Sequence, residues 1–310
     1  MNEIGILGIH AYVPETAVDV IEHASDYGVD ASFVHNKTGF VKLRRRIAGE
    51  DTADLAERAV RCALSSYPGL DNQLGLLLVV TQNPDGHGLP HASAIVHGRL
   101  GLPTSVAAFD ISLGCSGWVY ALSIAKSFME ANHINFGLLV TADPYSKIVD
   151  PQDRNTSLLF GDAATATLLG RDPTWQIGRF IFGTDGRLSN DLRVDEGGRL
   201  AMNGRSIFAF SATMVPACVQ EVLAANRLSL EDSDRIVLHQ ASRYIVEAIG
   251  ERLGCPAKVP FLASEVGNTV SSSIPLALAA GCCADDRVIV VTGFGVGLSW
   301  AATVLWHRMR

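Results

Sequence analysis

Short apolar runs alternate along the chain with longer stretches in which apolar residues recur every three or four positions. The runs are rich in Val, Ile and Leu and are too short for helices, which predicts buried β-strands. They are Leu74–Thr81, Phe136–Thr141, Ala164–Leu169, Arg235–Leu238 and Val288–Thr292. The longer stretches predict helices at Thr52–Ser66, His91–Leu100, Trp118–Asn132, Ser211–Ala225, Tyr244–Leu253 and Pro275–Cys283, the last with a proline in its first turn. Such alternation is typical of an α/β protein.

A boundary between two halves is predicted near residue 170. The apolar run that ends at Leu169-Gly170 is followed by the turn sequence Arg171-Asp172-Pro173. Residues 1–170 and 171–310 therefore form the two predicted units. No low-complexity linker or charged block separates them, so the halves are expected to be fused through one interface. The segment from Gly183 to Gly204 is rich in glycine and charge and is expected to be irregular.

One stretch, from Val288 to Trp306, carries no charged side chain and is nearly long enough to cross a bilayer. Gly293, Gly295 and Gly297 interrupt it, and glycine permits a tight turn between two strands. The pattern therefore predicts a buried pair of strands in place of a membrane span.

The composition indicates a folded chain with a large core. Of 310 residues, 48% are hydrophobic and 18% are charged, a balance that excludes intrinsic disorder. The 25 basic and 32 acidic side chains give a net charge of −7, which argues against a partner recognised mainly through nucleic-acid phosphates.

The cysteines and the N-terminus indicate a reducing compartment. Six cysteines are too sparse for a disulfide scaffold and lack the paired spacing of a zinc site. The adjacent Cys282 and Cys283 are expected to be small buried residues. No basic segment precedes an apolar one at the N-terminus, so no signal peptide is predicted and a cytoplasmic location is expected.

Cys115 is the first candidate for chemistry. It stands in the segment Leu113-Gly114-Cys115-Ser116-Gly117, directly before a predicted helix. Unpaired N–H groups and the positive end of the helix dipole lower the pKa of a thiol at such a helix start, and the flanking glycines allow close approach. A nucleophilic cysteine is one interpretation, and a buried structural cysteine is the other.

Two further polar residues stand at positions suited to chemistry. His239 comes at the end of the predicted strand Arg235–Leu238, where it could act as a base or donate a hydrogen bond to an oxyanion. Asn268, in Gly267-Asn268-Thr269, could donate from its amide without changing charge. Each also has a structural interpretation, as a core histidine and as a helix cap.

Together, these segments resemble the β-ketoacyl-acyl-carrier-protein synthase III family of condensing enzymes. Matching landmarks run through most of the chain, with the family's order and spacing: Gly5–Pro14, Lys37-Thr38-Gly39, Asp110–Tyr120, Asp150–Arg154, Leu158–Ala163, His239–Ala241, Gly267–Thr269 and Gly293–Trp300. The resemblance implies a thiolase-like five-layer αβαβα fold built from two similar halves, with the nucleophile in the first and the histidine and asparagine in the second. It also implies a homodimer.

The resemblance implies that Cys115 takes an acyl group from an acyl-CoA. His239 and Asn268 would then support decarboxylation of a malonyl thioester, carried by CoA or by an acyl carrier protein. The resulting enolate would attack the acyl-cysteine and give a 3-oxoacyl product and carbon dioxide, in fatty-acid initiation or in a specialised, polyketide-like pathway. The N–H of Cys115 and one from the turn Phe294–Gly297 would hold the thioester oxyanion. No metal or permanently bound cofactor is required, because the CoA or phosphopantetheine thioesters are substrates.

Further substrate contacts are implied by the same resemblance. Phe33 and Arg154 would clamp the adenine of CoA, and Lys37 would contact the nucleotide. Phe208 and Phe294 are also expected to contact substrate. Leu89 stands where the family's acyl pocket is limited by a residue that reaches across the dimer interface.

Two departures from the family pattern lie outside the implied catalytic residues. The positions that carry basic carrier-protein contacts in the family correspond here to Ala209, Tyr244 and Glu251, with Arg243 and Arg252 nearby. The loss of basic residues favours the specialised pathway. In addition, the segment between Gly186 and Met202 is several residues shorter than in typical members.

Two other functions are compatible with the sequence. An acyltransferase could pass the acyl group from Cys115 to an oxygen or nitrogen nucleophile without decarboxylation, although it would have less need of Asn268. A non-catalytic partner subunit of a synthase would commonly lack the nucleophile, so the presence of all three residues argues against it.

Overall fold

The computed structural model describes residues 3–280 and 285–308. Within these residues, ten strands form one sheet in the order β12-β13-β14-β8-β1-β7-β6-β4-β5, with β9 paired to β14. The strands are β1 (Gly5–Tyr12), β4 (Leu74–Val80), β5 (Ala107–Ile111), β6 (Phe136–Ala142), β7 (Ala164–Gly170), β8 (Trp175–Ile177), β9 (Ile181–Thr184), β12 (Arg235–Leu238), β13 (Val288–Gly295) and β14 (Ser299–His307).

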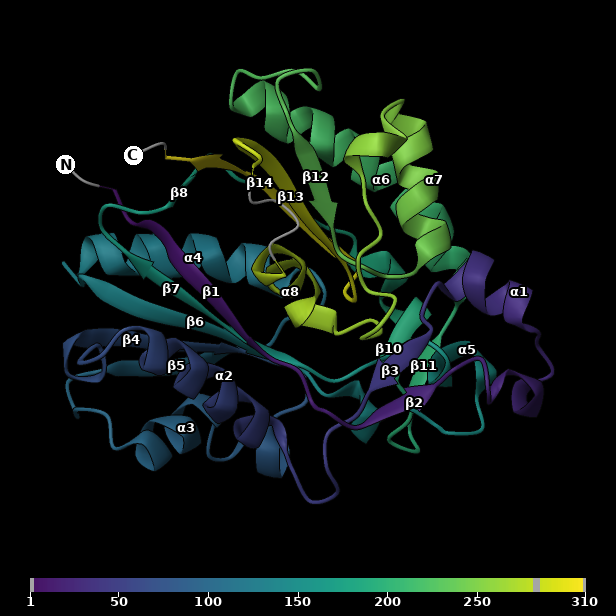
Figure 1. Cartoon of the computed structure of the whole chain (residues 1–310), viewed down its shortest axis with the longest axis horizontal. Coiled ribbons are helices and arrows are strands. Elements are labelled where there is room, and N and C mark those ends of the chain that lie inside the picture. Colours follow the sequence, from purple (N-terminus) through teal and green to yellow (C-terminus); the bar gives the residue numbers. More distant parts are fainter. Residues whose placement is uncertain (1–2, 281–284, 309–310) are drawn as a thin grey trace.

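Helices cover and separate two groups of these strands (Figure 1). The outer helices α2 (Thr52–Ser66) and α3 (Ala92–Leu100) pack on strands β1 and β4 to β7. The helices α4 (Gly117–Ala131) and α8 (Ser273–Ala279) lie between those strands and the group β12 to β14. On the far side, α6 (Gly204–Ala225) packs on β13 and β14, and α7 (Arg243–Leu253) packs on α6. This order gives the five layers of the predicted αβαβα fold.

The short strand β8 joins the two groups of strands. Trp175 pairs with Ile6 of β1 on one side, and β8 pairs with Leu305–His307 of β14 on the other. The strands on the β1 side of β8 all end by Gly170. The strands on the β14 side all follow β8 in the sequence. The division into units 1–170 and 171–310 itself stays a prediction.

The elements follow the hydrophobic pattern closely where local signals agree with it. Helix α2 has the predicted bounds because Asp51 and Asp54 form a capping box at its start. Helix α7 begins after the Ser242 cap and ends at Gly254 in the left-handed conformation. Pro275 lies in the first turn of α8, as predicted, while Cys282, Cys283 and the end of that predicted helix lie outside the described residues.

Two predictions about the middle of the chain are corrected. The segment from Gly183 to Gly204 is not wholly irregular, because β10 (Leu192–Val194) and β11 (Leu200–Met202) pair as a small antiparallel hairpin. Helix α6 begins at Gly204, well before the predicted start at Ser211, because the Asn203 side chain accepts a hydrogen bond from the Ser206 N–H and caps it there.

Four further short elements lie in the connections between β1 and α2 and between β6 and β7. They are β2 (Ala17–Asp19), β3 (Lys42–Arg44), α1 (Ala31–Phe33) and α5 (Arg154–Ser157). Strands β2 and β3 pair with each other, and Leu43 of β3 packs in a small apolar cluster with Val34 and Phe40.

The uncharged C-terminal stretch forms a β-hairpin, as predicted. Residues Val288–Gly295 pair in antiparallel register with Ser299–Trp306, and most of their side chains are buried. In the described parts of the chain, α6 is the one helix long and apolar enough to cross a membrane. Its packing on β13, β14 and α7 accounts for that composition.

Gly161 gives a test of this packing. A Cβ atom there would overlap the carbonyl oxygen of Val266, a backbone atom that cannot move independently. We expect Gly161→Ala to lower the free energy of unfolding by about 2 kcal/mol or more, measured by denaturant unfolding. Gly98→Ala is the control, because a Cβ atom at Gly98 in α3 meets open space. Equal stability of the two variants would contradict the prediction.

Candidate functional site

A cavity of about 490 Å³ is lined by residues from both sequence halves. Cys115, His239 and Asn268 all line it, so the structure brings the three candidate residues together. Each comes from a different connection: Cys115 precedes α4, His239 follows β12, and Asn268 lies before α8. Their catalytic roles stay a prediction.

The turn between β13 and β14 packs directly against Cys115. A Cβ atom on Gly295 would lie 2.7 Å from the Cys115 Sγ, and one on Gly293 would lie 2.8 Å from the Cys115 carbonyl oxygen. Both positions therefore require glycine. The N–H of Val296, in the same turn, hydrogen-bonds to the Cys115 sulfur and favours its charged form.

Burial reverses the pKa shift expected for Cys115. The helix begins only at Gly117, with Ser116 as its N-cap, and Cys115 is 6% exposed. Desolvation raises the pKa of the thiol to about 12, and the charge of Asp143 adds to this rise. The backbone hydrogen bond from Val296 opposes the shift but does not overcome it. The sulfur is therefore protonated at rest.

His239 is held neutral in the wall of the cavity. Its backbone N–H donates to the carbonyl of Thr292 over 2.9 Å, and its ring Nδ1 lies 2.6 Å from the Ser273 Oγ. The ring meets Phe294 edge-on at 5.5 Å. Burial lowers the pKa of the imidazole to about 3, although a hydrogen bond to the Val270 backbone partly opposes this. His239 lines the cavity, and its Nδ1 is the ring nitrogen engaged by Ser273.

Asn268 is fixed on both sides by the backbone. Its backbone N–H donates to the carbonyl of Leu159 over 2.8 Å, and its backbone carbonyl accepts from the Gly161 N–H over 3.0 Å. The side-chain oxygen accepts from the Val270 N–H at 2.9 Å. This bond identifies the oxygen end of the amide, so the NH₂ end is the group that can donate to a substrate. The hydrogen bond that this NH₂ group donates to the carbonyl of Ala241 is long at 3.5 Å.

Four of the predicted substrate residues lie around the same cavity as Phe294: Phe33, Lys37, Arg154 and Phe208. Phe208 stacks on Tyr244 at 5.0 Å, and the Lys37 ammonium lies 3.9 Å from the centre of the Tyr244 ring. The Tyr244 ring is thus engaged both by an aromatic ring and by a cation.

Leu89 does not line the cavity of its own chain. Its side chain is 85% exposed, next to the positive-φ residues His87 and Gly88. A contribution of Leu89 to an acyl pocket would need a second copy of the chain.

Tyr145 is a cavity residue that sequence reasoning did not identify. It is buried, contacts Phe160 at 4.9 Å, and donates a hydrogen bond to the Gln82 Oε1 at 3.2 Å. The available signal was its place just after the predicted strand Phe136–Thr141, because strand ends deliver side chains to sites in α/β proteins.

Comparison with known proteins agrees with this geometry. Residues 109–186 match the family model for 3-oxoacyl-[acyl-carrier-protein (ACP)] synthase III, and residues 223–306 match its C-terminal model. The chain is 36% identical to the β-ketoacyl-[acyl-carrier-protein] synthase III of Geobacillus kaustophilus, over 98% of this chain and 99% of that protein. The chain belongs to the 3-oxoacyl-[acyl-carrier-protein] synthase III family. The predicted family is thereby confirmed.

Solved structures of the synthase III family confirm the thiolase-like fold. A 3-oxoacyl-(acyl-carrier-protein) synthase III superposes with a TM-score of 0.91 at 34% identity, covering 98% of this chain and 99% of that one. The priming β-ketosynthase of the R1128 polyketide biosynthetic pathway superposes with a TM-score of 0.89 at 27% identity, covering 99% and 96%.

The neutral state of His239 has a measurable effect on stability. The unfolded chain takes up a proton at His239 near pH 6.5, whereas the folded chain resists it down to a pKa of about 3. Stability contributed by the neutral ring is therefore lost as the pH falls below 6.5. Between pH 7 and pH 5 we expect a loss of about 2 kcal/mol from this group. Unfolding free energies of wild type and His239→Gln should differ in their pH slope, and equal slopes would contradict the assignment.

Proposed function

We propose that the chain is an acyl-transferring condensing enzyme that loads an acyl group from acyl-CoA onto Cys115 and condenses it with a malonyl thioester. The observation that carries the proposal is the joint placement of Cys115, a neutral His239 and an amide-donating Asn268 in one cavity. The named relatives are synthases of this type, including a priming enzyme of polyketide biosynthesis.

In the first half-reaction, the Cys115 sulfur attacks the thioester carbonyl of acyl-CoA. The bond from sulfur to the acyl carbon forms, the bond to the CoA sulfur breaks, and the thiol proton goes to the leaving CoA. The N–H of Cys115, with an N–H from the turn Phe294–Gly297, stabilises the oxyanion. Close packing of Gly293 and Gly295 on Cys115 supports this placement.

In the second half-reaction, a malonyl thioester loses carbon dioxide and becomes an enolate. Two neutral donors at the enolate oxygen lower the barrier: the Nε2–H of His239 and the NH₂ of Asn268. The Ser273 hydroxyl can donate to Nδ1 at 2.6 Å and so hold the tautomer with the proton on Nε2. The enolate carbon then attacks the acyl-Cys115 carbon, and the 3-oxoacyl product leaves as Cys115 regains a proton.

The alternative acyltransferase would need a base to activate an oxygen or nitrogen acceptor. His239 is a weak base for that purpose, because burial lowers its pKa to about 3. The low basicity favours the condensing reaction, in which the same histidine acts as a donor. Carbon dioxide release from a malonyl thioester distinguishes the two functions.

We further propose that two copies pair, so that Leu89 of one chain limits the acyl pocket of the other. The support is its 85% exposed aliphatic side chain. The carrier of the malonyl group, CoA or an acyl carrier protein, and a cytoplasmic location stay predictions. The aromatic stack at Tyr244 in place of a basic contact favours a specialised pathway.

The first test is intact-protein mass spectrometry after brief exposure to acyl-CoAs of increasing chain length. We expect one added acyl group on wild type and none on Cys115→Ala. Cys218→Ala is the matched control, because Cys218 is also buried with a pKa raised to about 12 but does not line the cavity. Labelling of Cys115→Ala, or loss of labelling in Cys218→Ala, would contradict the assignment.

The second test concerns the grip on CoA. Arg154 lines the cavity with Phe33, and their clamp on adenine predicts that Arg154→Ala raises KM for acyl-CoA by about tenfold with kcat nearly unchanged. The matching acyl-pantetheine substrate lacks the adenine and serves as the control. An equal rise in KM for both substrates would show that Arg154 acts elsewhere.

A further inference from the structure

Tyr145 is a buried aromatic residue of the cavity wall to which the proposed mechanism gives no role. It is 3% exposed and lines the cavity together with Cys115. Its ring lies 4.9 Å from the ring of Phe160, which lines the same cavity. The backbone of Phe160 in turn pairs with Asn268 in an isolated parallel β-bridge. The two packed rings therefore form one piece of the wall, and this piece is tied to Asn268.

The hydroxyl end of Tyr145 is fixed next to the segment that carries the proposed nucleophile. This hydroxyl donates a hydrogen bond to the Gln82 Oε1 at 3.2 Å. A Cβ atom on Gly114 would lie 2.5 Å from that same oxygen, so the Gln82 amide occupies the space beside the residue that precedes Cys115. One amide oxygen therefore connects the Tyr145 hydroxyl to the start of the Cys115 turn.

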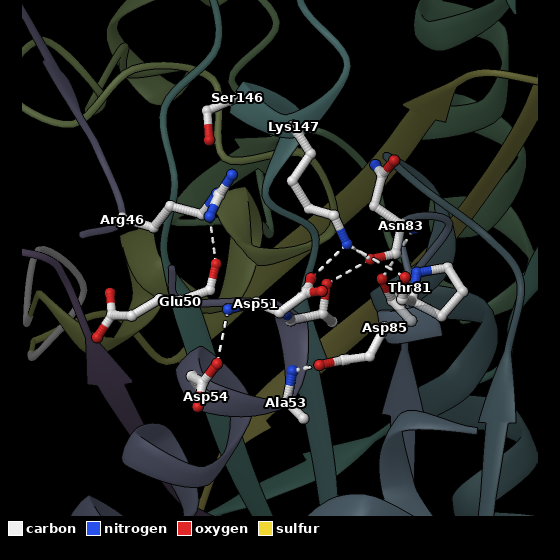
Figure 2. A network of polar contacts seen from close by, with 12 residues as sticks. Arg46, Glu50, Asp51, Ala53, Asp54, Thr81, Asn83, Asp85, Ser146 and Lys147 are labelled. Atoms are coloured by element: carbon white, nitrogen blue, oxygen red, sulfur yellow. Dashed lines mark hydrogen bonds and ion pairs between the residues drawn. The ribbon is translucent and has the colours of Figure 1, made fainter. Parts of the chain in front are cut away.

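A network of polar contacts fixes the connection after β4, which carries the acceptor of this hydrogen bond (Figure 2). Lys147, from the same turn as Tyr145, forms an ion pair with Asp51 at the start of α2. It also donates to the carbonyls of Asn83 at 2.9 Å and Pro84 at 3.1 Å. The turn and the connection are therefore joined at several points, which holds the Tyr145 ring in place against an entering acyl group.

The distribution of charge around the cavity indicates which part would hold an acyl group. Lys37, Arg154 and Arg205 line the cavity and are cations suited to the phosphates of CoA. Cys115 instead belongs to a cluster of buried apolar side chains that also contains Tyr145. Because the phosphates require the charged part, an acyl chain on the Cys115 sulfur would lie in the apolar part, against the Tyr145 ring.

We propose that Tyr145 is a specificity-determining residue that closes the acyl part of the cavity and restricts the starter to short acyl groups. The inference rests on the proposed function, because it takes the acyl group to be loaded from CoA onto Cys115. The cavity of about 490 Å³ lies in the lower part of the range for ligand sites and must also admit the pantetheine arm, so little room is left for a long chain. This wall lies within one chain and does not depend on pairing through Leu89.

The test is the binding of alkyl-CoA thioethers, which carry an alkyl chain but cannot transfer it, measured by isothermal titration calorimetry. For wild type we expect octyl-CoA to bind about tenfold more weakly than propyl-CoA, because the octyl chain meets the Tyr145 ring. Tyr145→Ala should bind octyl-CoA about tenfold more tightly than wild type does, with the Kd of propyl-CoA changed less than about threefold. Intact masses after exposure to propionyl-CoA and octanoyl-CoA should show the same shift in acylation of Cys115.

Two variants separate the size of the ring from other effects. Tyr145→Phe loses the hydroxyl but keeps the ring, so it should retain the preference for the short chain. Phe210→Ala is the structural control, because Phe210 is buried in the same apolar cluster but does not line the cavity. Its preference should also match that of wild type. If Tyr145→Ala does not fold, Tyr145→Leu takes its place and should shift the preference in the same direction.

The outcomes distinguish this inference from the proposed function. Equal binding of the two thioethers by wild type, an equal change for both in Tyr145→Ala, or a gain for octyl-CoA in Phe210→Ala would overturn the inference. A preference that depends on Tyr145 without acylation of Cys115 would contradict the proposed function alone. Acylation of Cys115 with an unchanged preference in Tyr145→Ala would contradict the inference alone, and failure to bind either thioether would contradict both.

Discussion

The backbone of the β13–β14 hairpin lies so close to Cys115 that neither Gly293 nor Gly295 could carry a side chain. This contact ties Cys115 to the C-terminal hairpin and brings the Val296 N–H to the sulfur. Strand β13 also pairs with β12, and the Thr292 carbonyl in β13 accepts a hydrogen bond from the backbone N–H of His239. One strand therefore sets the position of both groups, and a shift of β13 would displace them together.

Burial decides the electrostatics of the site. It raises the pKa of Cys115 and lowers that of His239, so both side chains are neutral in the resting protein. A resting thiolate–imidazolium pair is therefore excluded. In the proposed reaction, charge develops on the oxyanion and the enolate, where the fixed N–H donors would act in a buried site.

Local signals determine how far the sequence could predict the structure. The apolar runs and the capping box of α2 define their elements without help from the rest of the chain. His239 could be selected as a candidate because it directly follows the predicted strand Arg235–Leu238. The pKa of Cys115 was predicted in the wrong direction, because its burial depends on a hairpin far along the sequence. Tyr145 was missed for a similar reason, since its place in the cavity wall depends on Phe160 and Gln82. The side chain of Leu89 is 85% exposed within one chain, so its packing gives no signal of a role.

Tyr244 stands where the resemblance to the family implies a basic contact, and it lines the same cavity as Cys115. Tyr244 stacks on Phe208 and carries Lys37 on its ring, so one side chain supports both a wall of the channel and the placement of a cation. An arginine at this position would add charge, but it would also remove the aromatic ring on which Lys37 rests. The gain or loss of a basic contact is therefore coupled to the shape of the channel entrance. Neither change reaches Asn268, which the backbone holds from Leu159 and Gly161, so the entrance can vary while the condensing chemistry is retained.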